Sequence, residues 1–231
     1  MKNIFSLTIV SIWLATVNAE AKESTCYGTT KNGRLENGVR LPSSGNNFIS
    51  YSTAPELESR TYVHSIVKKV VVESYEELNL LNPQKLFKYA ETGFKSGGKF
   101  SPHKTHQNGL SIDFMVPVMD KNNNSVYFPT NAQNRYGYDV NFNDQGVNEN
   151  FKIDFESLGA HIVALNKASL NNNIELWRVI FAPDLQSKLY DTKYGDYIKN
   201  NVEIPTKKSW VRHDEHFHVD FKIKCKLFLK N

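Results

Sequence analysis

The stretch Gly109-Leu-Ser-Ile-Asp-Phe-Met-Val-Pro-Val-Met119 decides how this chain is expected to fold. Its residues alternate between two sets: Leu110, Ile112, Phe114 and Val116 in one, and Ser111, Asp113 and Met115 in the other. Alternation of this kind is typical of a β-strand that buries one face. The segment therefore predicts a strand whose apolar side chains enter the core, while Asp113 lies on the opposite face.

A second alternating stretch, His216-Phe-His-Val-Asp-Phe221, lies near the end of the chain. Phe217, Val219 and Phe221 take one face of the predicted strand, and the two histidines share the other. Elsewhere, periodicity and turn residues predict a helix over 61–80, a helix from Phe155 that ends near the polar run 171–173, a short helix from Pro183, strands over 86–94 and 174–182, and an ordered loop over 28–50.

The composition is that of an ordinary globular protein. The chain has 231 residues, of which 40% are hydrophobic and 12% aromatic, so it can bury a sizeable core. Lys and Arg total 28 against 24 Asp and Glu, and the net charge of +4 is spread without a polybasic block, which argues against a nucleic-acid partner. No repeat or Pro- or Ser-rich linker divides the sequence, so one domain is expected.

The first residues have the pattern of a secretory signal peptide. A short positive start precedes an apolar run over 4–17, and small residues then allow cleavage after Ala19 or, alternatively, after Ala21. The run is shorter than a membrane span, and no later stretch approaches that length. We therefore expect a signal peptide over 1–19 and a mature domain over 20–231, exported to the periplasm or secreted, without an integral membrane segment.

The two cysteines, Cys26 and Cys225, both belong to the predicted mature chain. Export places them in an oxidising compartment, where paired cysteines are usually bridged. A disulfide between the two ends of the domain is the prediction. Two buried thiols, or a bridge to another chain, are the alternatives.

Five of the seven histidines fall into two short segments: His103 and His106 within 101–113, and His213, His216 and His218 within 212–220. Two imidazoles and a carboxylate form a suitable ligand set for zinc and leave a fourth position for water or a substrate carbonyl. His106, Asp113 and His218 supply such a set. A lone histidine is usually a surface or core residue, but two segments on the polar faces of predicted strands together favour a metal site.

These segments resemble a known group of zinc peptidases. The H-x6-D spacing that ends at Asp113, followed by a C-terminal H-x-H, is similar to the signature shared by lysostaphin-type endopeptidases, D-Ala-D-Ala metallopeptidases and the hedgehog signalling domain. Within this group the chain most resembles the penicillin-insensitive murein endopeptidases, over 96–110, 178–181 and 213–219. The resemblance implies an α+β fold, a single domain with a central, mainly antiparallel sheet flanked by helices.

The resemblance also implies what the site residues do. His106, Asp113 and His218 match the ligands of a catalytic zinc ion, and His103 matches a further histidine close to the metal, either an extra ligand or an orienting residue. A second zinc ion remains an open alternative. The sequence lacks H-E-x-x-H, the motif of the common helix-borne zinc site, and G-x-S-x-G, the motif around the nucleophilic serine of many hydrolases. Both absences agree with the zinc site that the resemblance implies.

Two more histidines match catalytic positions. His216 matches the histidine that assists the metal-bound water, and His213 matches an active-site histidine that positions or stabilises the charged intermediate. The chain departs from its relatives at three sites: Ser111 replaces a frequent acidic residue, Glu215 a common histidine, and Asp220 a frequent basic residue. These departures leave the predicted ligand set intact.

The implied activity is hydrolysis of D-alanyl amide cross-links between the peptide stems of peptidoglycan. Arg212 adjoins the histidines and is a candidate partner for a substrate carboxylate. Tyr136, Tyr138 and Trp210 are weaker candidates for peptide contact, since aromatic residues more often serve packing. The alternatives are a D-Ala-D-Ala carboxypeptidase or dipeptidase, a zinc-binding hedgehog-like domain without turnover, and a structural domain that binds metal adventitiously. The oligomeric state is not indicated.

Overall fold

A computed structural model describes residues 22–207, 209 and 211–229 of the chain, so the predicted signal peptide and Trp210 lie outside the described residues. The strands are β1 (Thr25–Thr29), β2 (Asn32–Glu36), β3 (Val39–Arg40), β4 (Phe48–Ser50), β5 (Tyr62–Val63), β6 (Phe87–Tyr89), β7 (Ser111–Met115), β8 (Val118–Met119), β9 (Ser125–Val126), β10 (Lys152–Ile153), β11 (Glu175–Ile180) and β12 (His216–Lys222). The helices are α1 (Pro55–Glu58), α2 (Ser65–Leu81), α3 (Phe155–Asn171), α4 (Gln186–Tyr190) and α5 (Gly195–Asn201), with 3-10 turns η1 (Ala132–Gly137) and η2 (Pro183–Leu185).

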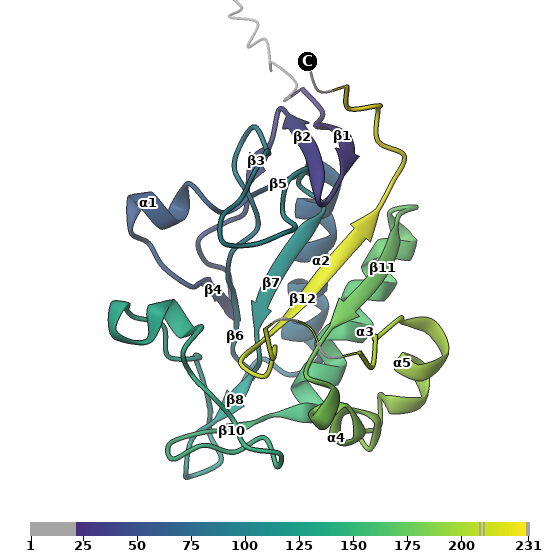
Figure 1. Ribbon diagram of the computed structural model, residues 1–231. Helices are drawn as coiled ribbons and strands as arrows, with labels where there is room; N and C mark the ends of the chain where they lie inside the picture. Colours follow the sequence, from purple (N-terminus) through teal and green to yellow (C-terminus); the bar gives the residue numbers. More distant parts are fainter. Residues whose placement is uncertain (1–21, 208, 210, 230–231) are drawn as a thin grey trace, which may run out of the picture.

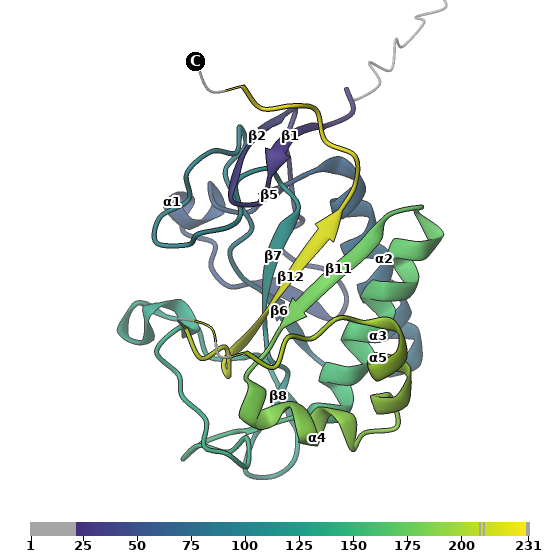
Figure 2. The ribbon, with the colours of Figure 1, turned by 45° about the vertical axis from the view of Figure 1, so that its right-hand side comes forward.

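The centre of the molecule is a five-stranded sheet in the order β11-β12-β7-β6-β4 (Figure 1). Neighbouring strands are antiparallel except for β4 and β6, which are parallel. The predicted α+β class and mainly antiparallel sheet are therefore confirmed. The long helices α2 and α3 do not flank the sheet on both sides. They lie together against one face, and loops cover the other (Figures 1 and 2).

The alternation in β7 and β12 decides which face receives the helices. Phe114 and Phe217 pair across the two strands with their rings stacked at 5.2 Å between centroids. Both rings contact the imidazole of His161 on α3, and Phe114 also meets Tyr75 on α2. Because neighbouring residues in a strand point to opposite faces, Asp113 and His218 are placed on the face away from these helices.

The prediction of a loop over 28–50 is wrong for much of its length, because β2, β3 and β4 lie within that range and β4 is an edge strand of the central sheet. Strands β1 and β2 form an antiparallel hairpin in which the buried Cys26 pairs with the buried Leu35. The turn-forming residues that favour a loop lie at the bend of this hairpin and in the segments that follow it. Gly28 is needed there, since its φ is +67° and an added Cβ would lie 2.2 Å from the carbonyl oxygen of Asn32.

Strand boundaries also differ from those expected. The strand expected over 109–119 divides into β7 and β8, because Pro117 lacks the N–H that a continuous ladder requires. β8 pairs with β9 and β10 in a separate small sheet. The predicted strand over 86–94 is reduced to β6, whereas α3 ends at Asn171, at the polar run where the sequence predicts its end.

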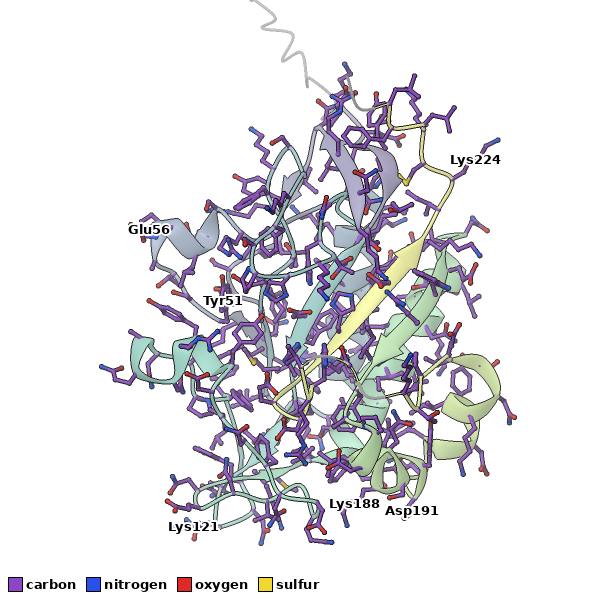
Figure 3. All side chains as sticks on the ribbon, viewed as in Figure 1. Tyr51, Glu56, Lys121, Lys188, Asp191 and Lys224 are labelled. Atoms are coloured by element: carbon purple, nitrogen blue, oxygen red, sulfur yellow. A yellow bond between two sulfur atoms is a disulfide. The ribbon has the colours of Figure 1, made fainter. Side chains whose placement is uncertain are left out.

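The predicted disulfide between Cys26 and Cys225 is confirmed, and it closes a sequence separation of 199 residues. It joins β1 to the segment that follows β12, as the sulfur bond in Figure 3 shows. Lys226 donates its backbone N–H to the carbonyl of Cys26 at 2.9 Å and accepts one from Gly28. Within the described part of the chain, no helix has the length and apolar character needed to cross a membrane.

Candidate metal centre

A cluster of titratable side chains lies on the loop-covered face of the sheet. Asp113 comes from β7, and its register partner His218 comes from β12, where His216 lies two residues earlier on the same face. The loop that precedes β7 brings His103 and His106 to the same place. The structure thus brings together all five histidines of the two sequence segments.

His106 is completely buried, and its ring is fixed by one hydrogen bond. Nδ1 lies 3.0 Å from the carbonyl oxygen of Thr92, which can only accept, so Nδ1 carries the proton and Nε2 keeps its lone pair. Nε2 has no hydrogen-bond partner among the described residues, yet it lies 3.3 Å from Oδ1 of Asp113. Two buried acceptors that face each other are the arrangement a cation would stabilise, so these residues fit a metal ion.

The charge states of the pair agree with this interpretation. Burial lowers the pKa of His106 against the opposing effect of Asp113, so the ring is neutral at pH 7. Burial alone would raise the pKa of Asp113, but His106 and His216 together hold it well below its usual range. Metal ligands must be deprotonated, and both side chains are ready to bind without losing a proton.

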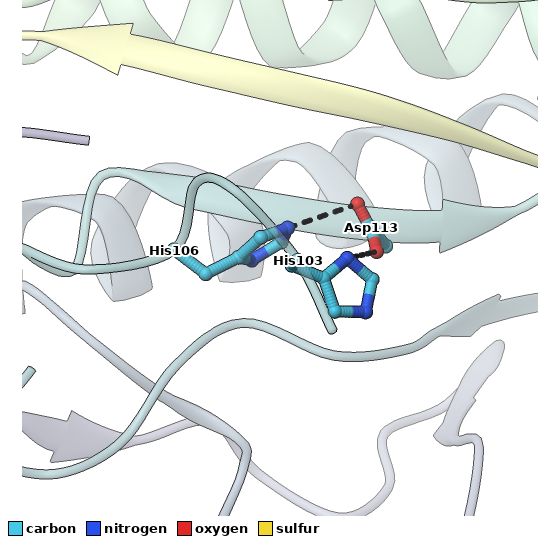
Figure 4. A group of neighbouring side chains, drawn as sticks. All are labelled: His103, His106 and Asp113. Carbon is cyan, nitrogen blue, oxygen red and sulfur yellow. Dashed lines mark ion pairs between the residues drawn. The ribbon is translucent and has the colours of Figure 1, made fainter. Parts of the chain in front are cut away.

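His103 completes a group of three whose ligand atoms lie within 4.8 Å of one another, together with His106 and Asp113 (Figure 4). Its Nδ1 is 3.7 Å from Oδ2 of Asp113, and its Nε2 is 2.5 Å from Oε2 of Glu91. Glu91 is buried and also paired with the guanidinium of Arg60. The ring is therefore oriented with Nδ1 toward the cluster.

His218 bridges two carboxylates. Nδ1 lies 2.8 Å from Oδ1 of Asp113, and Nε2 lies 2.9 Å from Oδ1 of Asp220. Burial lowers the pKa of the ring, but the two carboxylates outweigh it and raise the pKa to about 10. His218 lies outside the compact group of His103, His106 and Asp113, although its ring centroid is 4.8 Å from that of His106.

His216 presents one nitrogen to a carboxylate and the other to the cluster. Nδ1 is 2.7 Å from Oε1 of Glu215, whereas Nε2 is 3.9 Å from Oδ2 of Asp113. Burial lowers the pKa of His216, but Glu215 and Asp113 raise it above its usual value. The ring is thus held with Nδ1 on Glu215 and Nε2 directed toward Asp113, and its role as a general base stays a prediction.

His213 and Tyr138 border the same space. His213 donates Nδ1–H to the carbonyl of Val211 at 2.8 Å, and its ring centroid is 4.7 Å from that of His216. Burial lowers the pKa of His213 to about 4, so it is neutral at pH 7. The hydroxyl of Tyr138 donates to Oδ2 of Asp113 at 3.0 Å, and burial raises its pKa well above the usual value, so it keeps its proton.

Most of the cluster lines a cavity of about 630 Å³, and the residues that it contributes are His103, Asp113, His213, His216 and His218. The wall also includes charged and aromatic side chains: Glu91, Arg178, Glu215, Tyr51, Tyr136 and Tyr138. Tyr51 is marked in Figure 3. A cavity of this size that combines aromatic walls with convergent titratable groups has the properties of a substrate site.

Arg212 is placed differently from the histidines. Its guanidinium binds Asp214 at 2.8 Å and Asp184 at 2.7 Å, and it also donates to the carbonyl of Phe142. It is not among the residues that line the cavity. Contact between Arg212 and substrate stays a prediction.

Sequence reasoning missed the residues that hold the histidines in place. Glu91 carried no signal, because it lies in a segment known only as a predicted strand. Asp220 was noted solely as a departure from relatives. Its signal was present, however, since the alternation that puts His216 and His218 on one face also puts Asp220 there, opposite Ser111.

Comparison with known proteins agrees with this site. The family model described as penicillin-insensitive murein endopeptidase matches residues 26–227, which include every residue of the cluster and both cysteines. No curated protein matches the chain. The match covers most of the chain and joins a metallopeptidase family to a cluster of His and Asp side chains that can hold a metal ion. The chain belongs to the penicillin-insensitive murein endopeptidase family of metallopeptidases.

Proposed function

We propose that this murein endopeptidase holds a catalytic zinc ion through His106, Asp113 and His218 and cleaves D-alanyl amide cross-links between peptide stems. The observation that carries the proposal is the pair of buried acceptors, Nε2 of His106 and Oδ1 of Asp113, that face each other at 3.3 Å. In the part of the chain that the structure describes, Nε2 of His106 has no hydrogen-bond partner, and a cation between the two atoms would satisfy it. The buried His218 adds a third ligand atom, Nδ1, beside the same carboxylate oxygen.

Zinc is the metal best suited to these donors. Two imidazoles and one carboxylate match the three protein ligands of many catalytic zinc sites, whereas magnesium and calcium prefer oxygen alone. His103 is available as an extra ligand or as an orienting residue, because its Nδ1 is directed to Asp113. A bound zinc ion would lower the pKa of a coordinated water molecule and polarise a substrate carbonyl.

The chain's own residues provide the proton transfers. His216 donates Nδ1–H to Glu215, so Nε2 is the atom that accepts a proton from the attacking water and later donates it to the leaving amine. Its raised pKa belongs to the metal-free cluster, and a cation at Asp113 lowers it by repulsion. His213 lies beside His216 and assists the charged intermediate, while Tyr138 holds Oδ2 of Asp113 through its hydroxyl.

Export to the cell envelope fits this substrate. The predicted signal peptide and the disulfide both indicate an oxidising compartment, and peptidoglycan lies there. We infer a periplasmic or secreted enzyme whose fold is of the hedgehog and D-Ala-D-Ala peptidase kind. That inference agrees with a sheet that keeps its helices on one face and its site on the other.

Purified cross-linked muropeptides provide the direct test. The wild-type enzyme is expected to convert dimers to monomers, which mass spectrometry detects. Removal of metal with EDTA should abolish the conversion, and added zinc should restore it. His216→Ala should lower kcat by roughly 10²- to 10⁴-fold, the usual contribution of a general base, while the bound zinc content stays the same.

The outcomes separate the alternatives. Release of terminal D-Ala without cleavage of dimers would assign a carboxypeptidase. Zinc binding without any hydrolysis would assign a hedgehog-like domain without turnover. Full activity in EDTA, or in His106→Ala, would overturn the proposed metal site.

A further inference from the structure

A row of polar residues crosses the sheet directly beside the metal ligands. Asp220 on β12 is in register with Ser111 on β7 and with Arg178 on β11. The neighbouring row consists of Asp113 and His218, each two residues along its strand from Ser111 or Asp220 and on the same face of the sheet. The sheet therefore places a second layer of polar groups against the predicted ligands.

Every oxygen of Asp220 is occupied by a donor. Oδ1 accepts from Oγ of Ser111 at 2.6 Å and contacts Nε2 of His218 at 2.9 Å. Oδ2 accepts from Nε and Nη2 of Arg178 at 2.8 and 2.6 Å. Asp220 is fully buried, and a buried carboxylate of this kind is stable only when its charge is paired and its oxygens are satisfied.

Both nitrogens of His218 face ionised carboxylates, which accept hydrogen bonds and donate none, so both carry protons in the metal-free protein. A metal ligand must be deprotonated, and Nδ1, on the side of Asp113 and His106, is the nitrogen that would give up its proton to a metal. Asp220 keeps the proton on Nε2, away from the metal. Metal-bound histidines commonly have such a carboxylate behind them, which fixes the tautomer and the ring orientation.

We propose that Asp220, held by Arg178 and Ser111, is a positioning residue that fixes His218 with Nδ1 toward the metal. The inference rests on the proposed metal site and goes beyond it, since it assigns a role to three residues outside the ligand set. Asp220 acts through His218 and needs no contact with substrate.

Asp220→Asn tests the proposal without a change of size. The amide oxygen is required by Arg178, so the amide N–H group is left to face His218. A donor at that position favours the tautomer with the proton on Nδ1, which blocks the metal ligand. Zinc affinity, measured by competition with a chromophoric chelator, is expected to fall about 10- to 100-fold.

Asp154→Asn is the matched control. Asp154 is also a buried carboxylate with a cationic partner, Lys85 at 2.6 Å, and a serine donor, Ser157, but it does not line the cavity. Its substitution should lower stability and leave the zinc affinity unchanged. Equal losses of zinc affinity in both variants would overturn the proposal, because they would indicate a general effect of stability.

Nitrogen NMR of zinc-loaded wild type gives a measurement that does not depend on any variant folding. The expected spectrum shows His218 protonated on Nε2 and bound through Nδ1. Wild-type zinc affinity in Asp220→Asn, or metal on Nε2 of His218, would overturn this inference and leave the metal site standing. Failure of the wild type to bind zinc would overturn both together.

Discussion

His106 and His213 have backbone conformations that are uncommon for residues with a side chain. Their φ angles are +67° and +61°, in the left-handed region that favours glycine. Such a conformation costs on the order of 1 kcal/mol and persists only where the surroundings enforce it. Both rings donate Nδ1–H to a backbone carbonyl, of Thr92 and Val211 respectively. His213 lines the cavity, and His106 lies buried behind it in the group with His103 and Asp113. The strain therefore lies where ring orientation matters most.

Removal of metal should lower the melting temperature of the wild type. A ligand that binds the folded state at 100 times its Kd stabilises by about 2.7 kcal/mol, which shifts Tm by roughly 5–10 °C in a chain of this size. Differential scanning calorimetry with zinc and with EDTA measures the shift. In His106→Ala the two scans should coincide, and a persistent shift in that variant would place the stabilising ion elsewhere.

His161 should make the protein less stable in acid. Its ring lies on α3 among Tyr75, Phe87, Phe114 and Phe217, and neither ring nitrogen has a partner. Burial lowers the pKa of His161 from 6.5 to about 3. The unfolded chain therefore binds the proton more readily between these values, so the stability contribution is complete above pH 6.5 and is lost as the pH falls toward 3.

The corresponding loss of unfolding free energy is roughly 5 kcal/mol across the whole window. Urea titrations at several pH values between 4.5 and 7.5 measure the upper part of this loss. His161→Leu keeps an apolar side chain against the aromatic cluster and removes the titration, so its stability should vary less with pH. Identical pH dependence in the two proteins would assign the acid sensitivity to other groups.

At the scale of elements, Asp154 begins the helix that covers the sheet. Its Oδ1 accepts from the N–H of Ser157, and its Oδ2 pairs with Lys85. Asp154→Asn keeps a good cap but loses the charge, so we expect a loss of about 1–2 kcal/mol, the worth of a hydrogen bond to a charged group. Chemical denaturation gives the value, and unchanged muropeptide cleavage would show that the effect is confined to the helix. If Asp154→Asn lost muropeptide cleavage as well as stability, the effect would not be confined to the helix.

The central strands β7 and β12 were predictable from the sequence because burial follows their alternation, whereas β4 lies within the predicted loop. Phe114 and Phe217 face the helices, and Asp113 and His218 face the site, as the period of two requires. The hairpin of β1 and β2 was not predictable, because its strands are short and Gly28 and Gly33 near its bend are residues typical of loops. Nor does periodicity reveal that both long helices share one face of the sheet.

The convergence of the histidines was predictable from the sequence, whereas the side chains that hold them in place were not. The histidines converge because strand register brings β7 beside β12, which two alternating segments already suggest. Glu91 reaches His103 through a tertiary contact between segments with no common pattern. The guanidinium of Arg212 is bound by Asp184, which lies 28 positions earlier in the chain, and no sequence spacing indicates that contact.

At the scale of the whole molecule, the disulfide closes nearly the entire described chain. Its loss in Cys26→Ser/Cys225→Ser should lower the unfolding free energy by about 4 kcal/mol, because a closed loop of 199 positions restricts the unfolded state strongly. The His106 loop is tied to this region, since Gln107 donates to Thr30 and Asn108 contacts Cys225. We therefore expect greater mobility at His106, with the ligand residues still present.

Urea denaturation of the double variant measures the stability, and hydrogen exchange at residues 103–109 measures the mobility. Wild-type protein treated with dithiothreitol provides a second comparison without mutation. If stability falls but exchange in this loop stays as in the wild type, the disulfide serves the global fold alone.

The first and last segments that the structure describes also lie side by side, where β1 meets the segment after β12 (Figure 1). The Cα atoms of Cys26 and Cys225 are only 4.9 Å apart. Because these segments lie together, a chain that starts at another exposed turn would keep the same packing of strands and helices. A circular permutant with a short peptide joining the old ends, and new ends in the exposed turn around Asn123, keeps every strand of the central sheet uncut.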